Sequence, residues 1–219
     1  MTAPPLELTT VVSAPFQENC YIVWLAGRHD CLVVDPGLEP DKILDTLERL
    51  ELSPAAILNT HGHCDHVAGN GPLKQRWPDC VLVIGHREAE KLTDPRLNLS
   101  ADFGASLTSP PADRLVREGE RFSAAGIDLW VREIPGHSAG HVVYVYNGHQ
   151  PPVVFVGDVI FAQGIGRTDF PDGNFQLLAQ GIHQKLFSLP DDTVLLSGHG
   201  ASTTVGREKR ENPFVGLGS

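Results

Sequence analysis

The sequence of 219 residues contains no apolar run near the roughly 20 residues that a membrane-spanning helix needs. Its first residues show neither a basic segment nor the apolar stretch of a secretory signal, so we expect a cytoplasmic protein. Basic residues are also scarce, because 17 Lys and Arg stand against 27 Asp and Glu, a formal net charge of −10. This balance argues against nucleic acid or an anionic membrane as a partner, whereas one local basic patch still suits a small anionic molecule.

Cysteine is sparse and shows no metal-binding or disulfide pattern. The four cysteines form no C-x-x-C motif, so we expect reduced thiols that are mostly buried: Cys20, Cys31, Cys64 and Cys80. The chain also shows no linker, repeat or low-complexity segment. Its length therefore predicts a single domain over residues 1–219, large enough to bury a substantial core.

Strand and helix patterns alternate along the chain. Apolar runs and turn residues predict strands over residues 6–12, 20–25, 31–34, 55–58, 81–84, 127–133, 141–146, 153–156 and 193–196. Helical spacing predicts helices from Pro40 to Leu50, over 67–76 and over 174–189, with an irregular segment over 94–113. Interleaved elements of this kind indicate mixed sheets covered by helices.

The strongest chemical pattern follows the predicted strand at 55–58. Within six residues, His61-Gly62-His63-Cys64-Asp65-His66 supplies three imidazoles and a carboxylate, which suit Zn²⁺, Fe²⁺ or Mn²⁺. We expect a loop at the strand end to turn these side chains toward one point. The alternative interpretation is a polar surface loop.

Three further candidates each lie at or just beyond the end of a predicted strand: His137, Asp158 and His199. Side chains in this position are commonly aimed at one cleft by a rigid sheet. With the first motif they make seven possible ligands, enough for two metals that share one. A carboxylate can bridge two cations and a neutral imidazole cannot, so Asp158 is the expected bridge. Two metals about 3.5–4 Å apart generate a hydroxide at neutral pH and polarise a carbonyl.

These residues closely resemble the metallo-β-lactamase superfamily, whose fold is a four-layer αββα sandwich. The likeness extends over almost the whole chain, through Val33-Val34-Asp35-Pro36-Gly37, Pro135-Gly136-His137 and Gly157-Asp158. The resemblance implies one metal on His61, His63 and His137, a second on Asp65, His66 and His199, and Asp158 between them. It also argues against a true β-lactamase, since those enzymes generally lack this bridging carboxylate.

Within the superfamily, residues 164–170 and 202–214 are most similar to the short glyoxalase II-like hydrolases. This resemblance implies hydrolysis of a small acyl thioester, of the S-lactoylglutathione type, by a metal-bridging hydroxide, with zinc the first expectation for both metals. Since the sequence stops soon after residue 214, we expect no C-terminal helical domain of the kind that helps those enzymes bind glutathione. The sequence also has Arg167-Thr168-Asp169 in place of their Lys-Phe-Tyr.

Two other reactions remain open. Residues 166–170 are also similar to the persulfide dioxygenases, which place one iron on the positions of His61, His137 and Asp158. Lactone and phosphodiester hydrolases use the same seven ligands as the thioester hydrolases.

Three basic residues are candidates for binding an anionic substrate. Arg167 can bind a carboxylate through two hydrogen bonds. Arg207 and Lys209 belong to a small basic cluster that either attracts the substrate or forms a solvated helix face. We expect His141 to be structural, and the side chain of Cys64 to point away from the metals.

Overall fold

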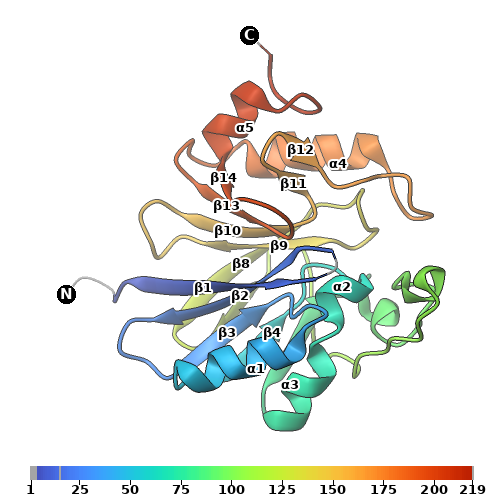
Figure 1. Cartoon of the computed structure of the whole chain (residues 1–219). Helices are drawn as coiled ribbons and strands as arrows, with labels where there is room; N and C mark the ends of the chain where they lie inside the picture. The colour runs from blue at the N-terminus through green and yellow to red at the C-terminus, as the bar shows by residue number, and fades with distance from the viewer. Residues whose placement is uncertain (1–3, 15, 219) are drawn as a thin grey trace.

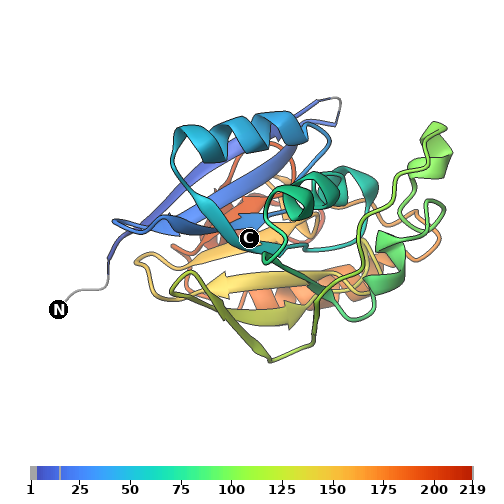
Figure 2. The same ribbon diagram turned by 90° about the horizontal axis from the view of Figure 1, so that it is seen from below.

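The structure is a computed structural model that describes residues 4–14 and 16–218. Two six-stranded sheets pack face to face, and helices cover the outer face of each sheet (Figure 1). The view from below shows the same layers edge-on (Figure 2). The predicted αββα sandwich of two mixed sheets is therefore confirmed.

The first half of the chain forms the first sheet, in the strand order β1-β2-β3-β4-β5-β6. β1 to β3 run antiparallel, and β3 to β6 run parallel. The strands are β1 (Leu6–Ser13), β2 (Glu18–Leu25), β3 (Asp30–Val34), β4 (Ser53–Leu58), β5 (Val81–Gly85) and β6 (Arg114–Val116).

The second half forms the second sheet, in the order β14-β13-β10-β9-β8-β7. All neighbours are antiparallel except β10 and β13, which are parallel. The strands are β7 (Arg121–Ala124), β8 (Ile127–Glu133), β9 (Val142–Tyr146), β10 (Val153–Gly157), β13 (Val194–Ser197) and β14 (Thr203–Thr204). A separate ribbon joins β11 (Ile160–Phe161) to β12 (Gly164–Ile165).

Side chains alternate between the two faces of a strand, so the apolar residues form three core layers. One lies between the sheets, and one lies between each sheet and its helices. In β2, Tyr21 and Val23 face the opposite sheet while Ile22 faces the helices. In β9, Tyr144 faces the first sheet and Val143 faces the other helical layer. Strands buried on both faces in this way appear in the sequence as continuous apolar runs.

The helices pack on the outer faces of the sheets. The first sheet is covered by α1 (Pro40–Arg49), α2 (Cys64–Val67), α3 (Asn70–Arg76) and the 3-10 helix η1 (Ala89–Leu92). The second is covered by α4 (Phe175–Gly181), the π-helix η3 (Ile182–Leu186) and α5 (Val205–Glu211). One further 3-10 helix, η2 (Ser100–Phe103), interrupts the irregular segment.

Two helix predictions need correction. The helix expected over 67–76 begins earlier and is split into α2 and α3, because Gly69 packs against Pro36. The Gly69 amide donates to the Pro36 carbonyl at 2.8 Å, and a Cβ at Gly69 would lie 2.7 Å from the Cβ of Pro36. The helix expected over 174–189 ends at Leu186 and changes from α to π geometry after Gly181.

The sequence patterns missed the shortest elements. β6, β7, β11, β12 and β14 span two to four residues each, too few for an alternating pattern. In the part of the chain that the structure describes, no helix is long and apolar enough to cross a membrane.

Candidate metal centre

The seven candidate ligands meet at one end of the sandwich, where segments of both sheets converge. His61 and His63 follow β4, whereas Asp65 and His66 lie on α2. The expectation that all four sit in a loop is therefore wrong for the last two. The other sheet contributes His137 between β8 and β9, Asp158 after β10 and His199 after β13.

The ligand atoms form three overlapping groups, in each of which the atoms lie within 4.8 Å of one another. The groups are His61, His63 and His137; His61, His66 and Asp158; and Asp65, His66 and His199. The first and third groups match the two sites that the family resemblance implies. The second contains Asp158 together with one residue of each site.

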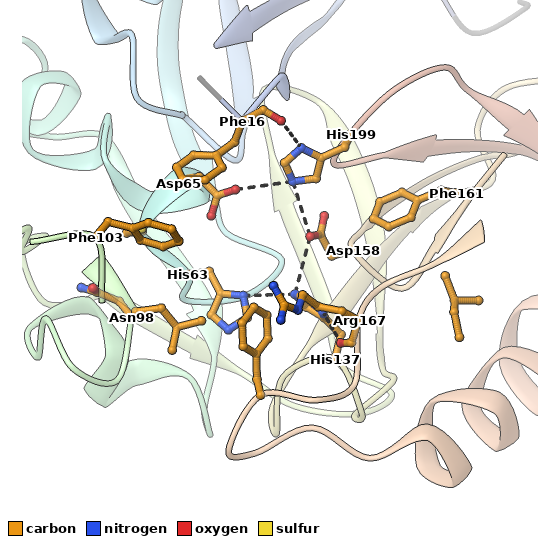
Figure 3. A pocket seen from close by; sticks show the side chains of 14 residues that line it. Phe16, His63, Asp65, Asn98, Phe103, His137, Asp158, Phe161, Arg167 and His199 are labelled. Atoms are coloured by element: carbon orange, nitrogen blue, oxygen red, sulfur yellow. Dashed lines mark hydrogen bonds and ion pairs between the residues drawn. The ribbon is translucent and has the colours of Figure 1, made fainter. Parts of the chain in front are cut away.

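Asp158 lies between the two sites. Its Oδ1 is 3.5 Å from His66 Nε2, while its Oδ2 is 3.5 Å from His137 Nε2 and 3.4 Å from His199 Nε2 (Figure 3). His199 Nε2 also lies 3.4 Å from Asp65 Oδ2. One carboxylate therefore faces ligands of both sites.

The polar atoms at the centre of this cluster fit bound metal ions. Buried atoms of His61, His66 and Asp158, namely both Nε2 atoms and Oδ1, have no hydrogen-bond partner among the described residues. His63 Nδ1 and His137 Nε2 face each other at 3.0 Å. Two nitrogens bound to one tetrahedral zinc at 2.0–2.1 Å would be about 3.3 Å apart. Unpaired buried groups are costly, and shared cations would satisfy them.

Contacts on the outer side of three rings, those of His61, His137 and His199, leave their Nε2 atoms available. His137 Nδ1 donates to the Arg167 carbonyl and His199 Nδ1 to the Phe16 carbonyl, both at 2.9 Å. His61 Nδ1 lies 3.1 Å from the Thr60 hydroxyl. A partner on one ring nitrogen fixes the tautomer and orients the other nitrogen toward a metal.

Asp35 supports the first motif from behind. Its carboxylate accepts the amide and the hydroxyl of Thr60, each at 2.7 Å, and lies 3.3 Å from His66 Nδ1. Asp35 is buried and follows β3 with φ +49°. The sequence analysis named this residue only as part of the motif Val33-Val34-Asp35-Pro36-Gly37 and assigned it no role at the metal centre.

His141 has a more specific role than packing. Its Nε2 accepts the backbone amide of Asp158 at 3.2 Å, and its ring stacks on that of His61 at 4.8 Å. The side chain is fully buried. It therefore fixes the backbone from which Asp158 projects.

Glu88 joins the two ligand loops and was missed by the sequence analysis. The fully buried carboxylate accepts the Gly62 amide at 2.9 Å. It also accepts the Ser138 hydroxyl at 2.7 Å and the Gly140 amide at 2.6 Å. Gly62 separates His61 from His63, and Ser138 follows His137, so one side chain sets the spacing of both loops.

Lys91 extends this network to a third loop. Its ammonium lies 3.4 Å from Glu88 Oε2 and 2.6 Å from Asp172 Oδ2, and only 7% of the residue is exposed. Asp172 in turn accepts the Ala139 amide at 3.0 Å. The segment that carries Arg167 and Phe170 is thereby tied to the His137 loop.

At two positions the backbone lies so close to the ligands that only glycine fits. A Cβ at Gly198 would lie 2.3 Å from Asp158 Oδ1 and 2.8 Å from His66 Cε1. At Gly166 it would lie 1.8 Å from the Asp158 carbonyl oxygen. No side chain fits at either place without moving the bridge.

Without metal, the imidazoles of the two sites differ in their tendency to be protonated. Burial opposes the charge of His66 and His199, but Asp65 and Asp158 outweigh it, raising the pKa of His66 well above its usual value and that of His199 to about 10. Burial, reinforced by neighbouring imidazoles, lowers the pKa of His61 and His63. A metal at the Asp65 site would therefore have to displace protons from His66 and His199, whereas the lowered pKa of His61 and His63 favours their neutral, metal-binding form.

A cavity of about 370 Å³ opens over the ligands. Apart from the ligands its walls are largely apolar, formed by Phe16, Leu99, Phe103, Phe161, Ile165 and Phe170 with Cys64, Asn98 and Arg167. Cys64 thus borders the cavity although it belongs to none of the ligand groups, and burial raises the pKa of its thiol to about 11.

The three basic candidates are not brought together. Arg167 borders the cavity, pairs with Asp169 through two contacts of 2.7 Å and lies 4.4 Å from the Phe170 ring. Arg207 and Lys209 lie on α5, outside the cavity lining, and pair with Glu211 at 3.0 Å and Asp191 at 2.6 Å. Their placement agrees with the solvated helix face that the sequence left as the alternative.

A family model and several known proteins match this chain. The model described as the metallo-beta-lactamase superfamily matches residues 13–199. Hydroxyacylglutathione hydrolase GloC of Haemophilus influenzae is 38% identical over 96% of this chain and 98% of its own length.

Solved structures are similar along nearly the full length. The BLEG-1 B3 metallo-beta-lactamase has a TM-score of 0.90 and 34% identity, covering 95% of this chain and 99% of its own. TTHA1623, solved in a di-iron-bound form, has a TM-score of 0.82 and 34% identity, covering 94% and 99%.

Proposed function

This chain belongs to the metallo-β-lactamase superfamily, and from that premise we propose that it is a two-metal hydrolase of acyl thioesters of the S-lactoylglutathione type. The observation that carries the proposal is the third ligand group. Asp65, His66 and His199 converge beside Asp158, in addition to the imidazoles of the first site. A single-metal enzyme has no need for that group.

Two divalent ions, zinc in our proposal and iron or manganese as alternatives, would supply a hydroxide at neutral pH and polarise the substrate carbonyl. The residues of the chain fix where this chemistry occurs. His61, His137 and His199 present Nε2 because a hydroxyl or a backbone carbonyl contacts the outer nitrogen of each ring. His63 instead faces His137 through Nδ1. Asp158 spans both sites, and His141 holds its backbone.

The acidic groups that line the cavity favour one kind of leaving group. A thiolate leaves without a strong general acid, unlike an amine or an alkoxide. Apart from the candidate ligands, the one acidic group among the described lining residues is the Cys64 thiol, and its pKa of about 11 makes it a weak proton donor. A thioester therefore suits this site better than an amide. The relative named hydroxyacylglutathione hydrolase supports the same substrate class.

A persulfide dioxygenase with one iron on His61, His137 and Asp158 is the second candidate. It is favoured by the Gly166–Phe170 segment, which places Arg167 at the cavity wall. Lactones, phosphodiesters and, given the likeness to BLEG-1, β-lactams are further substrates to exclude.

The deciding experiment combines metal analysis with a substrate panel. Protein reconstituted with zinc, and separately with iron, is assayed on S-lactoylglutathione, simple thioesters, a lactone, bis-p-nitrophenyl phosphate and nitrocefin. We expect close to two metals per chain and thioester hydrolysis without oxygen uptake. A plateau at one metal, with oxygen uptake on glutathione persulfide and no thioester hydrolysis, would establish the dioxygenase instead.

A further inference from the structure

A second hollow adjoins the metal cavity and extends it away from the ligands. Its volume is about 270 Å³, and it shares three lining residues with the metal cavity: Phe16, Cys64 and Phe103. The rest of its lining carries no charged side chain among the described residues, and consists of Leu38, Ser100, Ala105 and Leu107. The two hollows therefore adjoin each other across the side chains of Phe16, Cys64 and Phe103, and apolar surface extends from the metal ligands across this shared wall.

Phe16 and Phe103 stand where the two hollows meet. Their rings pack edge to face with centroids 5.2 Å apart, although 38% of Phe16 and 64% of Phe103 is exposed. Phe16 comes from the β1–β2 connection and Phe103 from the end of η2, so two distant segments place exposed aromatic surface at one spot. Exposed apolar surface concentrated beside a reactive centre is typical of a ligand site.

Positive charge lies on the other side of the metal cavity. Figure 3 shows Phe16 and Phe103 on the side of Asp65, and Arg167 beside His137. Arg167 is the one Lys or Arg among the described lining residues of either hollow, and Asp169 already neutralises it. We assign the thiol part of the substrate to this side, where the one cation of the lining lies, and the acyl group to the aromatic side.

We infer that the substrate's acyl group is uncharged and that its hydrocarbon part lies against the Phe16 and Phe103 rings, toward the second hollow. This inference rests on the proposed thioester hydrolysis and specifies its substrate class. A carboxylate on the acyl chain would lose its hydration in the second hollow and find no cation there, so charged acyl groups are rejected.

The test is a series of thioesters that share one small uncharged thiol, N-acetylcysteamine. Acetyl, butanoyl, hexanoyl and succinyl derivatives are compared on zinc-reconstituted protein. We expect kcat/KM to rise at least tenfold from acetyl to hexanoyl, because each methylene removed from water is worth up to about fourfold. Succinyl is expected at least tenfold below butanoyl, which has the same number of carbons.

Variants of Phe103 test whether this side chain causes the expected preference for the longer acyl group. Phe103→Ala is expected to reduce the hexanoyl-to-acetyl ratio at least fivefold, and Phe103→Leu to retain most of it. Phe214→Ala is the matched control, because Phe214 is 58% exposed and lies outside both hollows. An unchanged ratio in Phe103→Ala would overturn the assignment of this wall.

Product binding provides a measurement that needs no turnover. Calorimetry on zinc-loaded protein is expected to give at least tenfold tighter binding of hexanoate than of acetate. A flat thioester series, with hydrolysis present, overturns the acyl-group inference and leaves the proposed function standing. If no thioester is hydrolysed, the proposed function falls, and equal affinity for the two carboxylates then overturns the inference as well.

Discussion

Replacing Glu88 should damage both the fold and the metal centre. Glu88→Ala leaves three donors unpaired, those of Gly62, Ser138 and Gly140, and removes the buried carboxylate beside Lys91. Breaking a buried charged network by removing one partner costs about 3–5 kcal/mol of unfolding free energy. For a chain of this size that loss lowers Tm by roughly 10–15 °C. Both ligand loops lose an anchor, so metal affinity should also fall by about 10–100-fold.

Stability and metal affinity must be measured separately. Denaturant unfolding with a chelator present reports the fold alone, and competition with a chromophoric chelator reports the affinity. Glu90→Ala is the matched control, since Glu90 lies only two residues from Glu88, within η1, and is exposed. Glu88→Gln keeps the shape and one acceptor oxygen, so its losses should be about half as large. If Glu88→Ala unfolded at the same denaturant concentration as Glu90→Ala and bound metal equally well, the network would have no such role.

Three further outcomes are expected. Asp158→Ala should lower metal content and turnover together, by more than the about 10–100-fold typical of an outer partner; two retained metals with normal turnover would rule out the bridge. Metal binding should release protons at pH 7–8, because the raised pKa of His66 and of His199 (about 10) keeps both protonated beforehand, so affinity for the second metal rises with pH. Calorimetry in buffers of different ionisation enthalpy measures this release, and a value of zero contradicts it. Gly166→Ala should abolish tight metal binding, whereas Gly164→Ala, whose nearest neighbouring atom is 3.6 Å away, should not.

The sequence predicted most long elements of the fold because burial imposes a pattern on them. β8 occupies the predicted range, and β2 and β10 differ by one or two residues at their ends. The helix over Pro40–Arg49 shows the expected apolar spacing, with Ile43 and Leu47 buried. The edge strands β6, β7 and β14 were missed because each has only two to four residues, whereas the long edge strand β1 was predicted.

The candidate ligands were found from residue type and position, but their supports were not. His61 and His199 follow strands in a recognisable context, whereas Glu88 supports the site from a short 3-10 segment with no motif around it. Its role depends on three donors that come from two distant loops. Sequence spacing carries no information about such contacts. Arg207 and Lys209 show the converse limit, because a basic cluster in the sequence does not establish proximity to a cavity.

The division of the ligands between two sheets also affects how the protein is made. His61 to His66 leave the ribosome while the second sheet, with His137, Asp158 and His199, is still unmade. At about 5–20 residues per second, the delay before the last ligand appears is on the order of ten seconds. During synthesis the early imidazoles and Asp65 can capture any divalent ion, yet neither site can reach its mature form until the two halves dock. Metal choice would then depend on the supply of ions in the cell and on the geometry of the closed site, more than on the affinity of the nascent segment.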